Sequence, residues 1–160
     1  MFYFFDTSAL IKLYHEEDGS VLVSQLFESK SADVCIARLA FTEFYSALYK
    51  KYRTKEITDH RVILQSINDF EIDMQDVWVI QMHDKIFTDA QNLLKRYGLL
   101  HSLRTLDALQ LACAELAAQS EEITFITADI NLFNIATDMG FNVIFATDKN
   151  QLVNAASLIT

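Results

Sequence analysis

The sequence predicts a single α/β domain, a three-layer α/β/α sandwich with a mostly parallel central sheet. Short apolar runs alternate with longer segments of helical periodicity, and such alternation requires crossover connections between parallel strands. The chain has 160 residues, of which 51% are hydrophobic, so it can bury a sizeable core. It has three glycines, no proline, no repeat and no linker. We therefore expect one domain over residues 1–146 and a tail of that domain over residues 147–160.

Short runs rich in aromatic and β-branched residues indicate the buried strands of the sheet. They lie at residues 2–5, 33–37, 77–82, 123–127 and 141–145. The first run ends directly at Asp6, and the fourth is followed two residues later by Asp129. The order of these runs places a helical segment between most successive strands.

Helical periodicity marks the segments between the strands. The predicted helices cover residues 7–14, 21–28, 39–52, 58–74, 84–97, 103–114 and 130–139. Ser20 is expected to cap the second helix, because serine is a favourable N-cap residue. Gly98 and Gly140 are expected to end the fifth and the last helix, because glycine adopts the left-handed conformation that often follows a helix.

Charge and cysteine content exclude several classes of protein. The net charge of −9 argues against binding nucleic acid by bulk electrostatics, so RNA would need local cations. The candidates for such contacts are Lys12, Lys50, Lys51, Arg53 and Arg104. No apolar run approaches the length of a membrane span, and the N-terminus lacks a basic leader. Cys35 and Cys113 lie in apolar surroundings and are expected to be buried thiols in a reducing cytoplasm.

Four acids occupy positions that are typical of a functional site. Asp6 and Asp129 follow predicted strands, and ligands of parallel sheets bind beyond the carboxyl ends of the strands. Glu43 and Asp107 lie on helix faces formed otherwise by leucine and alanine. Simpler explanations exist for each acid. Asp6 and Asp129 could cap helices, Glu43 could lie at a helix edge, and Asp107 could be a first-turn acid behind a capping Thr105.

A cation explains all four acids together. Carboxylates brought close to one another take up protons unless a positive charge neutralises them. Because the candidates include no cysteine or histidine, the ion indicated is hard and oxygen-seeking, Mg²⁺ or Mn²⁺. An acidic site attracts a phosphate through such a metal, which indicates metal-assisted hydrolysis.

The segments around these acids resemble the four motifs of the PIN domain, most closely its VapC-like toxin branch. They read FDTSALIKLY at 5–14, FTEFYSAL at 41–48, LRTLDALQLA at 103–112 and ITADINL at 126–132. The resemblance extends in order and spacing to about Phe145. It implies a PIN-like fold and hydrolysis of RNA phosphodiesters by metal-activated water, with no covalent intermediate.

The resemblance also assigns roles to individual positions. It implies that Asp6, Glu43, Asp107 and Asp129 are the acidic quartet that holds the divalent metal. The hydroxyl groups that orient these acids would be Thr7, Ser8 and Thr127. It further implies a homodimer and a small antitoxin protein that covers the groove.

Other classes fit less well. Haloacid-dehalogenase-like phosphatases use an aspartate after the first strand as nucleophile and need a second acid two positions later, where this chain has Ser8. A phosphorelay receiver domain would use Lys149, but the helical stretch 39–74 fits it poorly. A non-catalytic PIN-like module that binds RNA or a protein is expected to lack one of the four acids, and this chain lacks none.

Overall fold

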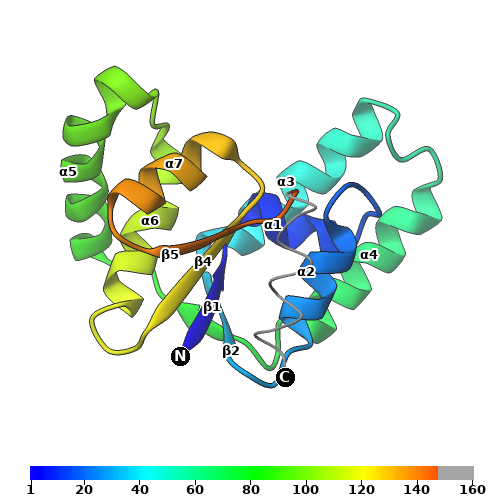
Figure 1. Cartoon of the computed structure of the whole chain (residues 1–160). Coiled ribbons are helices and arrows are strands. Elements are labelled where there is room, and N and C mark those ends of the chain that lie inside the picture. Colours follow the sequence, from blue (N-terminus) through cyan, green and yellow to red (C-terminus); the bar gives the residue numbers. More distant parts are fainter. Residues whose placement is uncertain (148–160) are drawn as a thin grey trace.

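One parallel sheet forms the centre of the computed structural model, which describes residues 1–147 (Figure 1). The strands are β1 (Phe2–Phe5), β2 (Asp33–Ala37), β3 (Trp78–Ile80), β4 (Ile123–Thr127) and β5 (Asn142–Phe145). Their order is β3-β2-β1-β4-β5, and every neighbouring pair is parallel. The predicted three-layer α/β/α class and mostly parallel sheet are therefore confirmed.

The strand order reverses between β1 and β4. The chain first runs outward from β1 through β2 to β3, then crosses to the other side of β1 and continues through β4 to β5. Ligands of open parallel sheets bind at such a switch point, beyond the carboxyl ends of the strands. The register pairs Phe5 with Ile126, and the Asp6 amide donates to the Ile126 carbonyl at 3.0 Å. The segments that follow β1 and β4 consequently start side by side.

Helices cover both faces of this sheet (Figure 1). One layer, together with the 3₁₀ turn η1 (Ile11–Leu13), consists of α1 (Thr7–Leu10), α2 (Ser20–Phe27), α3 (Leu39–Arg53) and α4 (His60–Asp73). The other layer consists of α5 (Asp84–His101), α6 (Thr105–Ala117) and α7 (Ile130–Asp138). Side chains of β1 alternate between the layers, with Tyr3 and Phe5 in the first core and Phe4 in the second.

Stacked aromatic rings lie in both cores. In the first core the rings of Phe44 and Phe70 stack with centroids 3.8 Å apart, which joins α3 to α4. In the second core Phe4 of β1 stacks on Phe125 of β4 at 5.6 Å. Cys35 and Cys113 are free and buried, as predicted. The helix α3, which carries Glu43, is thus fixed to α4 by the stacked rings, and it also contacts β2.

Several helix ends differ from those predicted. The N-cap of α2 is Gly19 instead of Ser20, because the chain enters the helix with φ of 94°, a conformation that favours glycine. The helix α5 does not end at Gly98 but continues to His101, and Ser102 takes the left-handed position with φ of 51°. Local helix formers such as Leu99 and Leu100 outweigh the single glycine. Gly140, with φ of 89°, does follow α7 as predicted.

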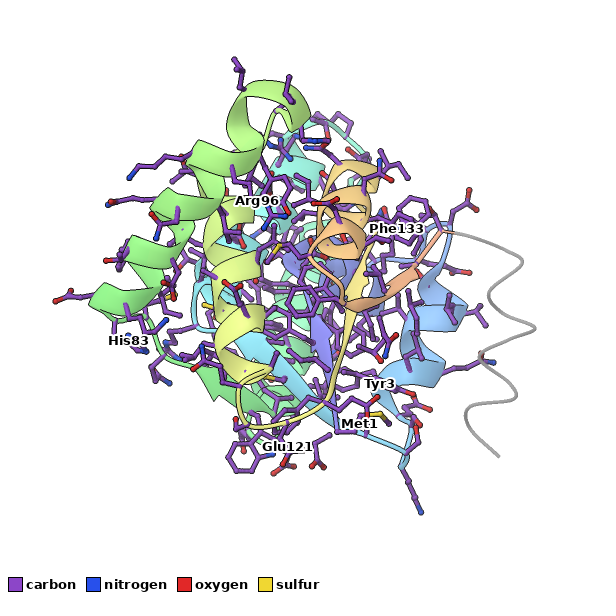
Figure 2. All side chains as sticks on the ribbon, turned by 60° about the vertical axis from the view of Figure 1, so that its left-hand side comes forward. Met1, Tyr3, His83, Arg96, Glu121 and Phe133 are labelled. Carbon is purple, nitrogen blue, oxygen red and sulfur yellow. The ribbon has the colours of Figure 1, made fainter. Side chains whose placement is uncertain are left out.

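The remaining predictions fall partly outside the described residues. The predicted helix over 7–14 is split into α1 and η1. Apart from Thr147, the predicted tail of residues 147–160 lies outside the described part of the chain, and so does Lys149. Within residues 1–147 no helix is long and apolar enough to span a membrane. Figure 2 shows Met1 and Glu121 together at the amino end of the sheet, where the N-terminal ammonium contacts the Glu121 carboxylate at 2.9 Å.

Candidate active site

The four acids singled out in the sequence line one cavity at the carboxyl edge of the sheet. The cavity has a volume of about 530 Å³. Asp6 follows β1, Glu43 lies in the middle of α3, Asp107 lies in the first turn of α6, and Asp129 separates β4 from α7. Residues from segments far apart in the sequence therefore meet at the switch point of the sheet.

Asp6 is buried at the end of the central strand, with 3% of its surface exposed. Its Oδ1 accepts hydrogen bonds from the Ser8 hydroxyl at 2.8 Å and from the Ala9 amide at 3.1 Å, so it also caps α1. Burial raises the pKa of the Asp6 carboxyl to about 7, and the nearby Glu43 and Asp129 carboxylates add to this rise. The hydrogen bonds from Ser8 and Ala9 oppose it. Among its hydrogen-bond partners, the Asp6 carboxyl thus has no cation that would balance a negative charge.

Asp129 caps a helix with one carboxylate oxygen and presents the other to the cavity. Its Oδ1 accepts from the amides of Asn131 at 2.8 Å and Leu132 at 3.1 Å, which fixes the start of α7. The Thr127 hydroxyl accepts from the Asp129 amide at 3.0 Å. The Ser8 hydroxyl accepts from the Ala128 amide at 2.9 Å and so ties this turn to Asp6. The second oxygen of Asp129, Oδ2, faces the cavity and accepts from Arg104 Nη2 at 3.2 Å.

Glu43 is oriented by a small polar network across three elements. Its Oε2 accepts from the Thr7 hydroxyl at 2.7 Å and from the Gln110 amide group at 2.6 Å. The same Gln110 nitrogen donates to the Thr7 oxygen at 3.0 Å. Gln110 is 2% exposed, and within the described chain its Oε1 atom is buried with no hydrogen-bond partner. Sequence reasoning missed Gln110, although its place three residues after Asp107 on an apolar helix was a usable signal.

Arg104 connects Asp107 to Asp129. Its Nε donates to Asp107 Oδ2 at 2.9 Å, and its Nη2 donates to Asp129 Oδ2 at 3.2 Å. Burial raises the pKa of the Asp107 carboxyl, while the hydrogen bond from the Arg104 guanidinium opposes that rise. The sequence predicts Arg104 as one of the cations that contact RNA. In the fold it is first of all a partner of two carboxylates.

The donor set of the cavity fits a hard divalent cation. All four acids offer oxygen atoms, and the buried Asp6 carboxyl lacks a cationic partner of its own among its hydrogen bonds. In the described chain, no three of these carboxylates place oxygen atoms within 4.8 Å of one another. The guanidinium of Arg104 instead holds Asp107 and Asp129.

A second group of possible ligands has a different explanation. His15, Glu17 and Glu56 do bring potential ligand atoms within 4.8 Å. However, the Glu17 carboxylate already contacts Lys12 at 2.9 Å and Lys51 at 2.7 Å. This cluster is therefore neutralised by lysines, and it lies outside the cavity of the four acids.

The cations proposed from the sequence occupy two environments. Lys50 and Arg104 line the cavity, and Arg53 is exposed at the end of α3. Lys12 is 7% exposed and its ammonium group contacts Glu17 and the Asp18 carbonyl. Lys51 contacts Glu17 and Glu56. Lys12 and Lys51 thus serve ion pairs within the fold, and Arg104 pairs with two acids of the cavity, which leaves Lys50 and Arg53 for contact with a ligand.

Comparison with known proteins gives a consistent result. Residues 3–138 match the family model described as PIN domain. Ribonuclease VapC45 of Mycobacterium tuberculosis strain CDC 1551 is 31% identical over 111 residues, which cover 69% of this chain and 73% of the relative. Ribonuclease VapC49 of strain H37Rv matches with the same identity and coverage.

Solved structures with low sequence identity share the architecture. Mycobacterium tuberculosis VapC20, described as a sarcin-ricin loop cleaving toxin, superposes with a TM-score of 0.63 at 18% identity and covers 87% of this chain and 95% of its own. VapBC2 from Rickettsia felis, bound to a DNA fragment from its promoter, gives 0.61 at 16% identity, with 90% and 98% covered. At these identities the structures establish a common fold.

Proposed function

Because this chain belongs to the PIN domain family, we propose that it is an endoribonuclease that hydrolyses RNA phosphodiester bonds and serves as the toxin of a toxin–antitoxin pair. The observation that carries the proposal is the meeting of Asp6, Glu43, Asp107 and Asp129 in one cavity at the switch point of the sheet. The two curated relatives are themselves named ribonucleases.

We propose that these four carboxylates hold Mg²⁺ or Mn²⁺, which prefer oxygen ligands. When bound, such an ion polarises the phosphodiester and lowers the pKa of a water molecule, so that a hydroxide is available near neutral pH. The chain itself supplies the orientation of the ligands. Ser8 directs Asp6, Thr7 and Gln110 direct Glu43, and Thr127 and the first amides of α7 direct Asp129.

The cations at the cavity would hold the RNA backbone. Lys50 and Arg104 line the same cavity as the acids, and Arg53 follows Lys50 by one helical turn. Contacts of this kind bind phosphates without reading the base, which suits a protein whose overall charge repels RNA. The phosphates would therefore be held by local cations, although the protein carries a net charge of −9.

The partners follow from the same proposal. Solved neighbours of this fold include a toxin–antitoxin complex from Klebsiella pneumoniae and VapBC-1 from nontypeable Haemophilus influenzae. We propose that a small antitoxin protein covers the cavity of this chain and that the chain works as a homodimer in the cytoplasm, where RNA is present. Co-purification with the product of a neighbouring small gene tests the antitoxin directly.

The activity is tested with a mixed pool of RNA incubated with Mg²⁺ or Mn²⁺ and, in parallel, with EDTA. The wild type and a Glu115→Gln variant are expected to cut RNA only with metal, because Glu115 lies on α6 but outside the cavity. Asp107→Asn is expected to lose cleavage while keeping its circular dichroism spectrum. Equal cleavage in EDTA would contradict the proposal. Binding of RNA without any cleavage would favour a non-catalytic binding module.

A further inference from the structure

We propose that Arg104 is a built-in counter-ion of the site, which occupies Asp107 and Asp129 in the metal-free protein and is displaced by the metal to bind a substrate phosphate. This inference rests on the proposed function, and it adds a regulatory step to the same cavity. Arg104 thereby acts as a positioning residue in one state and as a phosphate ligand in the other.

The contacts of Arg104 show why it competes with a metal. Its two donors go to Oδ2 of Asp107 and to Oδ2 of Asp129. The other oxygen of Asp129 is committed to two amides at the start of α7, so Oδ2 is the atom left for a cation. A guanidinium and a divalent ion therefore seek the same oxygen atoms. The fork of the guanidinium spans one carboxylate on α6 and another at the N-cap of α7.

The position of Arg104 in its helix is unfavourable on structural grounds alone. It is the N-cap of α6, and its side chain makes no capping hydrogen bond. N-cap positions favour serine, threonine, aspartate or asparagine, and the positive end of the helix dipole disfavours a cation. The same guanidinium also reaches the N-terminus of α7 through Asp129. Only the carboxylates make this place suitable for an arginine, which indicates a role tied to them.

The exposure of Arg104 allows it to move. Its side chain is 72% exposed, while Asp107 and Asp129 are 16% and 26% exposed. Swinging the guanidinium outward costs little buried surface, and it leaves the carboxylates facing the cavity. Among the described residues that line this cavity, Lys50 is the other cation. A guanidinium released at its rim is placed to bind a phosphodiester in a bidentate manner.

Metal affinity tests whether Arg104 competes with the metal for Asp107 and Asp129. Binding of Mn²⁺ is measured by isothermal titration calorimetry for the wild type, Arg104→Ala, Arg104→Lys and Arg61→Ala. Arg61 is the matched control, because it pairs at 2.8 Å with Asp59, which caps α4 well away from the cavity. We expect Arg104→Ala to bind Mn²⁺ about three- to tenfold more tightly, the range expected when two exposed ion pairs cease to compete. Arg61→Ala should match the wild type.

A second readout follows the arginine itself. The Nε–H resonance of Arg104 is observed in ¹⁵N-labelled, metal-free protein and is assigned by its absence from the spectrum of Arg104→Ala. We expect this resonance to shift when Mg²⁺ is added. The resonance of Arg61 should stay in place. At saturating metal, Arg104→Ala is expected to show a KM for RNA about tenfold higher than that of the wild type.

The outcomes separate this inference from the proposed function. Unchanged or weaker Mn²⁺ binding by Arg104→Ala, with metal-dependent cleavage retained by the wild type, would overturn the role of Arg104 and leave the nuclease intact. Tighter binding with an unchanged KM would overturn the phosphate step. Absence of Mn²⁺ binding by every variant would overturn the inference together with the proposed metal site.

Discussion

The Thr7 hydroxyl donates a hydrogen bond to Glu43 Oε2 at 2.7 Å, although the two residues are 36 positions apart in the sequence. Thr7 is the first residue of α1, directly after the buried Asp6, and Glu43 lies on α3 in the same helical layer. This hydrogen bond therefore fixes the Glu43 side chain on α3 relative to the end of the central strand β1. Gln110 of α6 closes the arrangement from the opposite layer of helices.

Gln110→Leu tests whether this orientation matters for the reaction. We expect the kcat for RNA cleavage to fall about 10- to 100-fold, because outer groups that orient metal-binding acids have effects of this size. The free energy of unfolding should change little, because removal of the buried Oε1 atom, which has no partner in the described chain, offsets the loss of the hydrogen bonds that Nε2 donates to Glu43 and Thr7. Steady-state kinetics and thermal unfolding measure the two effects. A wild-type kcat in a folded Gln110→Leu protein would show that Thr7 alone orients Glu43.

Asp6 makes the metal-free protein sensitive to pH. The pKa of its carboxyl is raised from 3.8 to about 7 in the fold, chiefly by burial, so the folded state binds a proton that the unfolded state has released. The free energy of unfolding of the wild type should therefore fall as the pH rises from about 4 to above 7. Asp6→Asn keeps a good N-cap residue and removes the titration.

The expected difference is largest in alkaline buffer. In EDTA at pH 8, Asp6→Asn should be more stable than the wild type by on the order of 2–4 kcal/mol, and near pH 4, close to the pKa of the unfolded carboxyl, this advantage should shrink toward zero. Urea unfolding at the two pH values measures it. Adding Mg²⁺ at pH 8 should stabilise the wild type alone. A constant difference between the two proteins across this pH range would show that Asp6 does not titrate as inferred.

Sequence patterns predicted the sheet and its acids because both depend on local or regular features. Apolar runs marked all the strands, and the rule that ligands bind at strand ends drew attention to Asp6 and Asp129. The contacts of Arg104 and Gln110 depend instead on how closely α6 approaches α3 and α7, and no periodicity in the sequence specifies that distance. Two of the predicted helix ends were wrong because a single residue type does not fix a helix boundary. Gly98 is a local stop signal, but the exposed helix formers Leu99 and Leu100 extend α5 past it.

The three glycines should respond differently to alanine. At Gly19 a Cβ would lie 2.0 Å from the Ala146 carbonyl oxygen, and φ is 94°, so Gly19→Ala should destabilise the protein by at least about 2 kcal/mol. Gly140 has φ of 89° but open space around it, so Gly140→Ala should cost about 1 kcal/mol. Gly98 lies inside α5 with open space, and Gly98→Ala should stabilise by about 0.5–1 kcal/mol. Urea unfolding ranks them. A destabilised Gly98→Ala would mean that α5 ends near the predicted position.

Lys50 and Lys51 are neighbours in sequence with separate expected roles. Lys50 is exposed and lines the cavity, whereas the Lys51 side chain is 14% exposed and contacts Glu17 at 2.7 Å and Glu56 at 3.1 Å. Lys50→Ala should weaken binding of single-stranded RNA and reduce the slope of log K against log salt by about 0.7, the value for one lost phosphate contact. Lys51→Ala should leave that slope unchanged and lower the free energy of unfolding by about 1–2 kcal/mol, because Glu17 loses one of its two partners.

Both lysine variants are measured in an Asp107→Asn background, so that RNA stays intact during fluorescence anisotropy titrations at several salt concentrations. Urea unfolding of the same proteins gives their stabilities. A reduced salt slope in Lys51→Ala would mean that this ammonium leaves Glu17 and Glu56 to reach RNA. An unchanged slope in Lys50→Ala would place the path of the RNA away from the end of α3. The two slopes together therefore show on which side of α3 the phosphates pass.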